Sequence, residues 1–345
     1  MSQNKRTELA ELGEFGLIEA LTQGFTNQNK ESILGIGDDA AILDFQNQQV
    51  VVSTDMLVEG MHFDLSYTPL KHLGFKAVAV NVSDICAMNA RPTQITISIG
   101  VSNRFSVEAL QEFYEGVQEA CKTYNVDLVG GDTVSSLKGF IISVTALGCA
   151  PAQQLVRRNG AKVGDVICAS GNLGSAYIGL QILEREKMIF KEHQTIQPQL
   201  EEHQYCIARL LKPEARLDIT QALQKANVVP TSMIDLSDGL SSEINHLCKQ
   251  SNVGAIIEDA LLSIHEKTYE TASMTFNIDP TNCALFGGED YELLFTINPK
   301  DLEAIRYMPD VKIIGEIIPP QDGIKLQTKS GKLHDLVPNG WTHFS

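Results

Sequence analysis

The stretch Ile234-Asp235-Leu236-Ser237-Asp238-Gly239 stands where a predicted strand at residues 232–235 meets a predicted helix. Leu240, Ile244 and Leu247 mark the apolar face of that helix. The start of a helix offers free backbone N–H groups and the positive end of the helix dipole, and both favour anions. An aspartate used as the N-cap would explain only one of the two carboxylates. The stretch therefore predicts a strand–turn–helix unit whose turn binds a ligand.

Further segments of the chain also combine carboxylates with glycines, strand ends or helices. They read Gly35-Ile36-Gly37-Asp38-Asp39, Ser53-Thr54-Asp55, Asn81-Val82-Ser83-Asp84, Gly130-Gly131-Asp132 and Gly287-Gly288-Glu289-Asp290. Each of them alone is compatible with an ordinary turn. Together they predict one pocket that holds several hard cations, and such pockets usually carry out phosphate chemistry.

Asp84 interrupts a predicted helix at residues 71–89, which is apolar on nearly every side and is therefore expected to be buried. A buried carboxylate without a partner costs several kcal/mol. Asp84 therefore predicts a metal ion or an ion pair. The alternative is a position at the exposed rim of the helix.

The segment Ser53-Thr54-Asp55 ends a predicted strand at residues 50–55. Successive side chains on a strand point to opposite faces, so Ser53 and Asp55 share one face. A hydroxyl beside a carboxylate suits a magnesium ion that keeps some of its waters.

Two glycine pairs also stand beside predicted strands. Gly130-Gly131-Asp132 follows a strand at residues 126–129, and Gly287-Gly288-Glu289-Asp290 precedes a strand at residues 291–297. Glycine lets the backbone approach a ligand closely, and its N–H group can meet a phosphate oxygen. Arg158 could reach an ATP phosphate, or it could be a solvated surface residue.

The length of 345 residues predicts two domains, at residues 1–150 and 151–345, divided near Ala150-Pro151-Ala152. The formal net charge of -16 argues against direct binding of nucleic acid or of an anionic membrane surface. It is compatible with a nucleotide ligand, because divalent cations can stand between acidic side chains and phosphates.

The seven cysteines are scattered and form no Cys-x-x-Cys, which predicts reduced core thiols in a cytoplasmic protein. The polar start of the chain predicts no signal peptide, and no apolar run approaches the roughly 20 residues that span a bilayer. The motifs of P-loop enzymes and of protein kinases are missing, and no His/Cys cluster has zinc spacing.

The acidic segments, in this order, resemble the thiamine-monophosphate kinase family, part of the aminoimidazole ribonucleotide synthetase-like superfamily. The resemblance runs through residues 14–344 and is carried by residues 35–43, 53–63, 76–88, 129–133, 158–165, 234–241 and 287–295. Two features differ from the family pattern: Ala215 stands where relatives often have proline, and the extension before Glu14 is longer than usual.

The resemblance implies a two-domain α+β fold. Its N-terminal domain would bind metal and ATP and form a homodimer through its sheet, and a C-terminal α/β domain would follow. Several Mg²⁺ ions would be held by Asp39, Ser53, Thr54, Asp55, Asp84, Asp132, Asp235 and Asp238. ATP would be bound by Gly131, Asp132, Arg158 and Ser237, and thiamine monophosphate by His62, Glu289 and Trp341.

The activity implied is transfer of the γ-phosphoryl group of ATP to thiamine monophosphate, the final step of thiamine diphosphate biosynthesis. We expect direct in-line attack by a phosphate oxygen, which is already anionic and so needs no general base. One alternative is an ATP-dependent synthetase or kinase of the same superfamily with another acceptor. A second alternative is an inactive regulator that binds a nucleotide.

Overall fold

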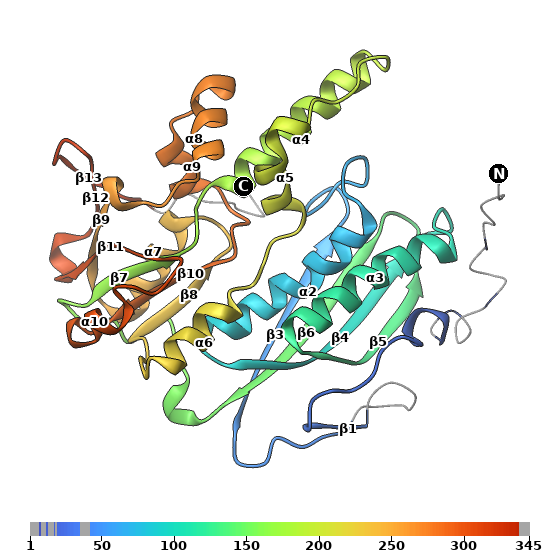
Figure 1. Ribbon diagram of the computed structural model, residues 1–345, viewed down its shortest axis with the longest axis horizontal. Helices are drawn as coiled ribbons and strands as arrows, with labels where there is room; N and C mark the ends of the chain where they lie inside the picture. The colour runs from blue at the N-terminus through green and yellow to red at the C-terminus, as the bar shows by residue number, and fades with distance from the viewer. Residues whose placement is uncertain (1–6, 8–11, 13–16, 18, 35–41, 338–345) are drawn as a thin grey trace. The chain divides into compact units, whose positions relative to one another are not determined.

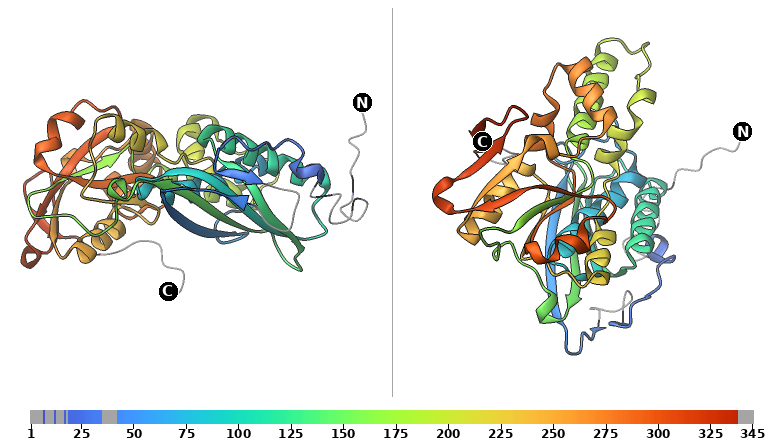
Figure 2. Two further views of the ribbon diagram at one scale, coloured as in Figure 1. Left: turned by 90° about the horizontal axis from the view of Figure 1, so that it is seen from below. Right: turned by 60° about the vertical axis from the view of Figure 1, so that its left-hand side comes forward.

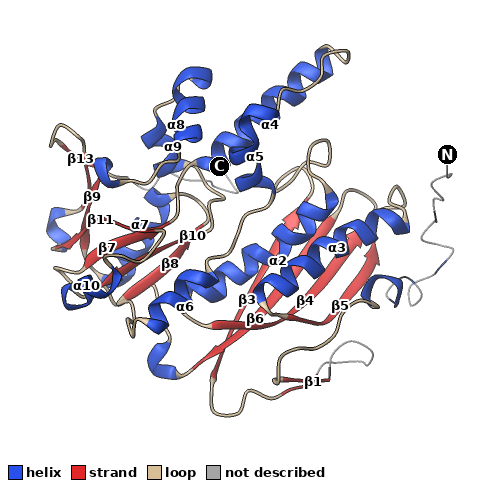
Figure 3. Cartoon of the chain, in the orientation of Figure 1, coloured by secondary structure: helices blue, strands red, loops and turns tan. Residues whose placement is uncertain are grey.

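The computed structural model describes residues 7, 12, 17, 19–34 and 42–337. The chain divides into two compact units, one formed by Met1–Ile85 with Ala90–Ala152 and the other by Cys86–Asn89 with Gln153–Ser345. Each unit combines helices with a β-sheet (Figure 3). The fold is therefore of the α+β class.

The first unit is built on a four-stranded sheet with the strand order β3-β6-β4-β5 (Figure 1). β6 is antiparallel to both of its neighbours, and β4 and β5 are parallel. The described elements of this unit are β1 (Ser32–Leu34), β2 (Ile42–Leu43), β3 (Gln49–Val58), α2 (Leu70–Ala87), β4 (Arg91–Val101), α3 (Val107–Tyr124), β5 (Asp127–Ser135) and β6 (Ile141–Ala150).

Helices α2 and α3 cover one face of this sheet (Figure 2). Ile95 and Ile97 of β4 point to that face and are almost completely buried. The other face is exposed, and Val52, Met56 and Val134 keep 60%, 55% and 53% of their surfaces in solvent. The sheet of the first unit thus has one buried face and one solvent-exposed face, and the exposed face carries these three apolar side chains.

α2 and α3 approach each other closely at two glycines. A Cβ atom on Gly116 would lie 1.8 Å from the carbonyl oxygen of Lys71, and one on Gly74 would lie 1.9 Å from that of Phe113. No larger residue fits at these positions without moving the helices apart. The contact fixes the separation of α2 from α3, and α2 carries Asp84.

The second unit contains a seven-stranded sheet with the order β13-β12-β9-β11-β7-β10-β8. β9 and β12 are parallel, and the other neighbouring pairs are antiparallel. The strands are β7 (Val166–Ser170), β8 (Ser232–Leu236), β9 (Gly254–Glu258), β10 (Glu292–Ile297), β11 (Val311–Ile318), β12 (Ile324–Gln327) and β13 (Leu333–Asp335). The α-helices are α4 (Ser175–Glu192), α5 (Gln204–Leu211), α6 (Leu217–Lys225), α7 (Leu240–Ser251), α8 (Glu266–Glu270), α9 (Pro280–Phe286) and α10 (Leu302–Ile305).

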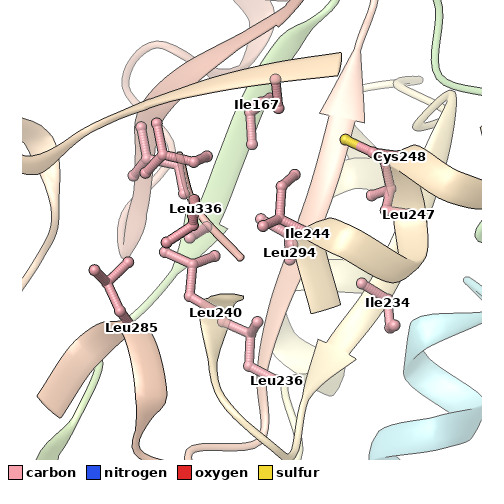
Figure 4. Close-up of a cluster of buried hydrophobic side chains, with 14 of the residues drawn as sticks. Ile167, Ile234, Leu236, Leu240, Ile244, Leu247, Cys248, Leu285, Leu294 and Leu336 are labelled. Atoms are coloured by element: carbon pink, nitrogen blue, oxygen red, sulfur yellow. The ribbon is translucent and has the colours of Figure 1, made fainter. Parts of the chain in front are cut away.

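The predicted apolar face of α7 forms the centre of the core of this unit (Figure 4). Leu240, Ile244 and Leu247 are almost fully buried, and they belong to one cluster with Ile167 of β7 and Leu294 of β10. Packing α7 on the sheet in this way fixes the turn between β8 and α7, which contains Ser237-Asp238-Gly239. The predicted strand–turn–helix unit is confirmed.

Two predicted strand ends are wrong. β3 continues through Ser53-Thr54-Asp55 to Val58, because β6 pairs with it along its whole length. β5 likewise contains Gly130-Gly131-Asp132, because β4 pairs with it in parallel as far as Ser135. Both acidic segments therefore lie inside strands, where the sheet register fixes their positions.

All seven cysteines are buried free thiols, as predicted. None of the helices in the described residues combines the length and apolar character that a membrane span requires.

Candidate active site

Ser53, Asp55 and Asp84 meet between β3 and α2 in the first unit. The Ser53 Oγ donates a hydrogen bond to Asp84 Oδ2 at 2.5 Å. Asp84 is half-buried on α2, and its carboxyl group is also hydrogen-bonded to that of Asp55. The predicted sharing of one face by Ser53 and Asp55 is confirmed, and that face is turned toward α2.

The proximity of the two carboxyl groups affects the protonation of Asp55. Burial, the charge of Asp84 and the hydrogen bond between the two carboxyls together raise the pKa of Asp55 to about 6, with burial the largest cause. Although much of Asp55 is exposed to solvent, its carboxyl group is turned toward Asp84. A cation at this position would remove the repulsion between the two groups.

Two carboxylates and a hydroxyl fit the donor preference of Mg²⁺, which takes oxygen ligands and usually binds through one or two carboxylates, waters and substrate phosphates. Within the described part of the chain, no group of three or more His, Cys, Asp or Glu side chains could hold a metal ion by itself. The pair is therefore suited to a cation that arrives with a phosphate ligand.

Asn81 has a role at the carboxylate pair that the sequence analysis did not predict. Its Oδ1 accepts a hydrogen bond from the Asp55 backbone N–H at 3.0 Å, and its Nδ2 donates to the carbonyl of Ala77 at 3.0 Å. The side chain is buried. The sequence did contain a signal for this role, because an amide side chain one turn before Asp84 in an apolar helix needs a hydrogen-bond partner. Asn81 ties β3 to α2 at the carboxylate pair.

Thr54 and Asp132 do not join this group. The Thr54 Oγ1 donates to the carbonyl of Val144 and accepts from Thr145, on the opposite face of the sheet. Asp132 is exposed beside Ser98 in the register, and its Oδ1 accepts from the N–H of Thr133. β6 and β4 lie between β3 and β5, so the edge strands are about 14 Å apart at roughly 4.8 Å per strand step.

Gly131 has a structural requirement of its own. A Cβ atom at this position would lie 1.9 Å from the carbonyl oxygen of Ile97 on the neighbouring strand β4. In the structure, Gly131 therefore allows β5 to approach β4 closely. Its predicted contact with ATP stays a prediction.

His62 stands in the turn that follows β3. Its Nδ1 accepts a hydrogen bond from the N–H of Val58 at 3.1 Å, so the neutral ring carries its proton on Nε2. A pocket of about 400 Å³ opens at this end of β3, lined by Val58, Glu59, Gly60, Asp64, Lys138, Gly139, Phe140 and Ile141. The hydrogen bond to Nδ1 thus holds the ring in one orientation.

In the second unit, Asp235, Asp238 and Glu243 form an acidic group at the turn between β8 and α7. Glu243 Oε1 accepts from the N–H of Asp238 at 3.1 Å. Burial, together with the charges of Asp238 and Asp235, raises the pKa of Glu243 to about 8. The N-cap of α7 is Gly239, so neither aspartate occupies the N-cap position.

The Gly287-Gly288-Glu289 segment packs directly on Ser237. The N–H of Glu289 donates to the Ser237 carbonyl at 2.7 Å, and a Cβ atom on Gly288 would lie 2.5 Å from that same oxygen. Two segments that the sequence predicted to share a pocket are thus in contact. The glycine allows the approach, and the predicted ATP-binding and substrate-binding residues Ser237 and Glu289 become neighbours.

Asp290 is turned away from Glu289 into the interior. Its carboxylate accepts from the N–H of Gly174 at 2.7 Å, and burial raises its pKa to about 7. Arg158 is exposed, and its carbonyl accepts from Ser251 Oγ. Asp39 and Trp341 lie outside the described residues.

Comparison with known proteins shows a match to the family model "AIR synthase related protein, N-terminal domain" at residues 37–150. The chain is 36% identical to the thiamine-monophosphate kinase of Aquifex aeolicus (strain VF5), over 97% of this chain and 99% of that protein. The crystal structure of thiamine-monophosphate kinase from Stenotrophomonas maltophilia K279a is similar, with a TM-score of 0.77, 31% identity and coverage of 92% of this chain and 95% of that chain. The structure of AaThiL complexed with AMPPCP and TMP has a TM-score of 0.76, 34% identity and coverage of 98% and 99%.

Proposed function

This chain belongs to the thiamine-monophosphate kinase family, and we propose that it makes thiamine diphosphate and ADP by one in-line transfer of the γ-phosphoryl group of ATP to thiamine monophosphate. The observation that carries the activity is the match, over nearly the whole of both chains, to a relative with this name. The similar structure with AMPPCP and TMP supports ATP and thiamine monophosphate as the two substrates.

The acceptor brings its own charged nucleophile. A phosphate oxygen of thiamine monophosphate is already anionic, so no side chain has to remove a proton from it. The task of the protein is to bind and orient two anions that repel each other. Asp55, Asp84 and Ser53 in the first unit, and Asp235 and Asp238 in the second, would hold Mg²⁺. When bound, Mg²⁺ supplies the positive charge that reduces this repulsion.

Among the remaining predicted residues, His62, Ser237 and Glu289 have surroundings that fix their positions. His62 is held through Nδ1 in the turn after β3, and we assign it to the acceptor. Ser237 and Glu289 are held together by the hydrogen bond between their main chains. We assign Ser237 to the nucleotide and Glu289 to the acceptor, together with Arg158, Gly131, Asp132, Thr54, Asp39 and Trp341 in the roles that the family resemblance implies.

We also propose a homodimer and a cytoplasmic location. The open face of the first unit's sheet carries Val52, Met56 and Val134, and contact with the same face of a second copy would bury these side chains. Met56→Lys should then lower the mass measured by sedimentation from dimer to monomer, and an unchanged mass would contradict this interface. The buried free thiols agree with a reducing compartment.

The decisive experiment incubates the protein with ATP, Mg²⁺ and thiamine monophosphate and separates the products by chromatography. We expect thiamine diphosphate and ADP in equal amounts. ADP formed with another acceptor but never with thiamine monophosphate would favour a related synthetase. ATP binding without any ADP would favour an inactive nucleotide-binding regulator.

A further inference from the structure

A network of buried charged side chains lies next to the Gly287-Gly288-Glu289 segment in the second unit. Its centre is Glu292, which is 1% exposed. Its carboxylate accepts from Arg216 Nη1 at 2.6 Å, from Arg209 Nη2 at 2.8 Å and from Ser170 Oγ at 2.5 Å. The charge of Glu292 is thus fully engaged by protein groups and is not available to a ligand.

Arg209 also reaches the main chain next to Glu289. The same Nη2 atom that binds Glu292 donates to the carbonyl oxygen of Asp290 at 2.9 Å. The carboxylate of Asp290 accepts from the N–H of Gly174 at 2.7 Å, at the start of α4. Asp290 is therefore fixed at its side chain and at its carbonyl.

The two residues beside Asp290 have backbone conformations that side chains disfavour. Glu289 has a φ of 70° and Tyr291 a φ of 52°, both in the left-handed region. Residues with a Cβ keep such conformations only where the surrounding contacts over-determine them. Here those contacts are the hydrogen bonds of Asp290 and the main-chain bonds of Glu289 to Ser237 and of Tyr291 to Leu236.

We infer that Arg209 is a positioning residue for the acceptor: through the Asp290 carbonyl it holds Glu289 in the left-handed conformation in which that side chain meets thiamine monophosphate. The inference rests on the proposed function, which assigns Glu289 to the acceptor. Arg209 is largely buried and contacts protein groups, so it acts through Glu289 and not on the substrate itself.

The contacts of Arg209 predict which substitutions at this position preserve its role. Both of its hydrogen bonds are donated by one nitrogen, Nη2. The ammonium group of lysine keeps the charge and has three donors, so Arg209→Lys retains a donor close to both acceptors, whereas Arg209→Met retains none. A role in positioning thus predicts rescue by lysine.

The test measures the KM of both substrates for Arg209→Met, Arg209→Lys and the exposed control Arg306→Gln. For Arg209→Met we expect the KM of thiamine monophosphate to rise roughly tenfold, the effect of losing one hydrogen bond to a charged donor, with the KM of ATP changed by less than about twofold. Arg209→Lys and Arg306→Gln should stay close to wild type.

A double-mutant cycle separates positioning from general stabilisation. In a Glu289→Ala background the acceptor contact is already lost, so Arg209→Met should raise the KM of thiamine monophosphate no further. If Arg209→Met does not fold, Arg209→Gln, which keeps a shorter polar side chain, replaces it in the same comparison.

Equal rises in both KM values would overturn the inference, as would a lower melting temperature with unchanged KM values or a full Arg209→Met effect in the Glu289→Ala background. In each of these cases the proposed function stands, because wild type still forms thiamine diphosphate. A wild-type protein that forms none would overturn both.

Discussion

Asp84→Asn should make the metal-free protein more stable while it abolishes turnover. Two unit charges 4 Å apart repel by about 1 kcal/mol in water and by about 4 kcal/mol at the effective dielectric near a protein surface. Because part of the Asp55 side chain is in contact with solvent, which screens the repulsion, the low end applies, and we expect a gain of about 1 kcal/mol, or about 2 °C in melting temperature. Asparagine keeps an oxygen that can accept from Ser53 Oγ, so this hydrogen bond is retained.

The pH dependence has a definite sign. The pKa of Asp55 is about 6 in the folded protein and 3.8 in the unfolded chain, so the folded state binds more protons between these values. The free energy of unfolding of the metal-free protein therefore falls as the pH rises from about 4 to about 6 on account of this group. Removing the charge of Asp84 lowers the pKa of Asp55 and flattens this fall.

The assay is thermal unfolding followed by circular dichroism at pH 8, first with EDTA and then with Mg²⁺ and a non-hydrolysable ATP analogue. Wild type should gain stability from the ligands, since they bind the folded state, and Asp84→Asn should gain much less. Glu112→Gln, which removes an exposed carboxylate of α3, should behave as wild type in both buffers. An Asp84→Asn protein that is less stable than wild type in EDTA, or that gains as much from Mg²⁺ and nucleotide, would refute this reasoning.

Three further predictions follow from single contacts. Asn81→Leu leaves the Asp55 N–H without its acceptor and should lower the free energy of unfolding in urea by about 2 kcal/mol. It should also weaken Mn²⁺ binding measured by electron paramagnetic resonance, and an unchanged Mn²⁺ affinity would contradict a role of Asn81 at the Asp55–Asp84 pair. Glu243→Gln should be more stable than wild type at pH 9 but not at pH 4, because the raised pKa of Glu243, about 8, makes wild type lose stability as the pH rises from about 4.5 to 8; parallel pH profiles would be evidence against this. Gly116→Ala should cost about 3 kcal/mol in urea unfolding, since its Cβ would lie 1.8 Å from the Lys71 carbonyl, and a cost below about 1 kcal/mol would mean that α2 and α3 separate easily.

The sequence was sufficient to predict the helix that carries Asp84 and the need of this residue for a partner. The apolar pattern of residues 71–89 has the helical period, and α2 is confirmed at Leu70–Ala87. The identity of the partners could not be read from the same pattern. Ser53 and Asp55 lie on another element, and only the packing of α2 on β3 brings them to Asp84.

Strand ends were harder to predict than strand positions, for a physical reason. Glycines and carboxylates disfavour strands locally, so Ser53-Thr54-Asp55 and Gly130-Gly131-Asp132 were expected to terminate them. A neighbouring strand that continues to pair overrides this preference, as β6 does for β3 and β4 for β5.

The number of carboxylates in a segment does not show which of them bind a cation and which are paired within the protein. In Gly287-Gly288-Glu289-Asp290-Tyr291-Glu292, the carboxylate of Glu292 already has two arginines and that of Asp290 has backbone N–H groups at the start of α4. Asp55 and Asp84 have a different environment, because the two acids face each other, and burial together with the charge of Asp84 raises the pKa of Asp55. Glu292 is paired within the fold and needs no ligand, whereas two acids that face each other repel in the empty protein and are stabilised by a bound cation. This difference supports the proposal that the Asp55–Asp84 pair binds a cation and that Asp290 and Glu292 support the segment that carries Glu289.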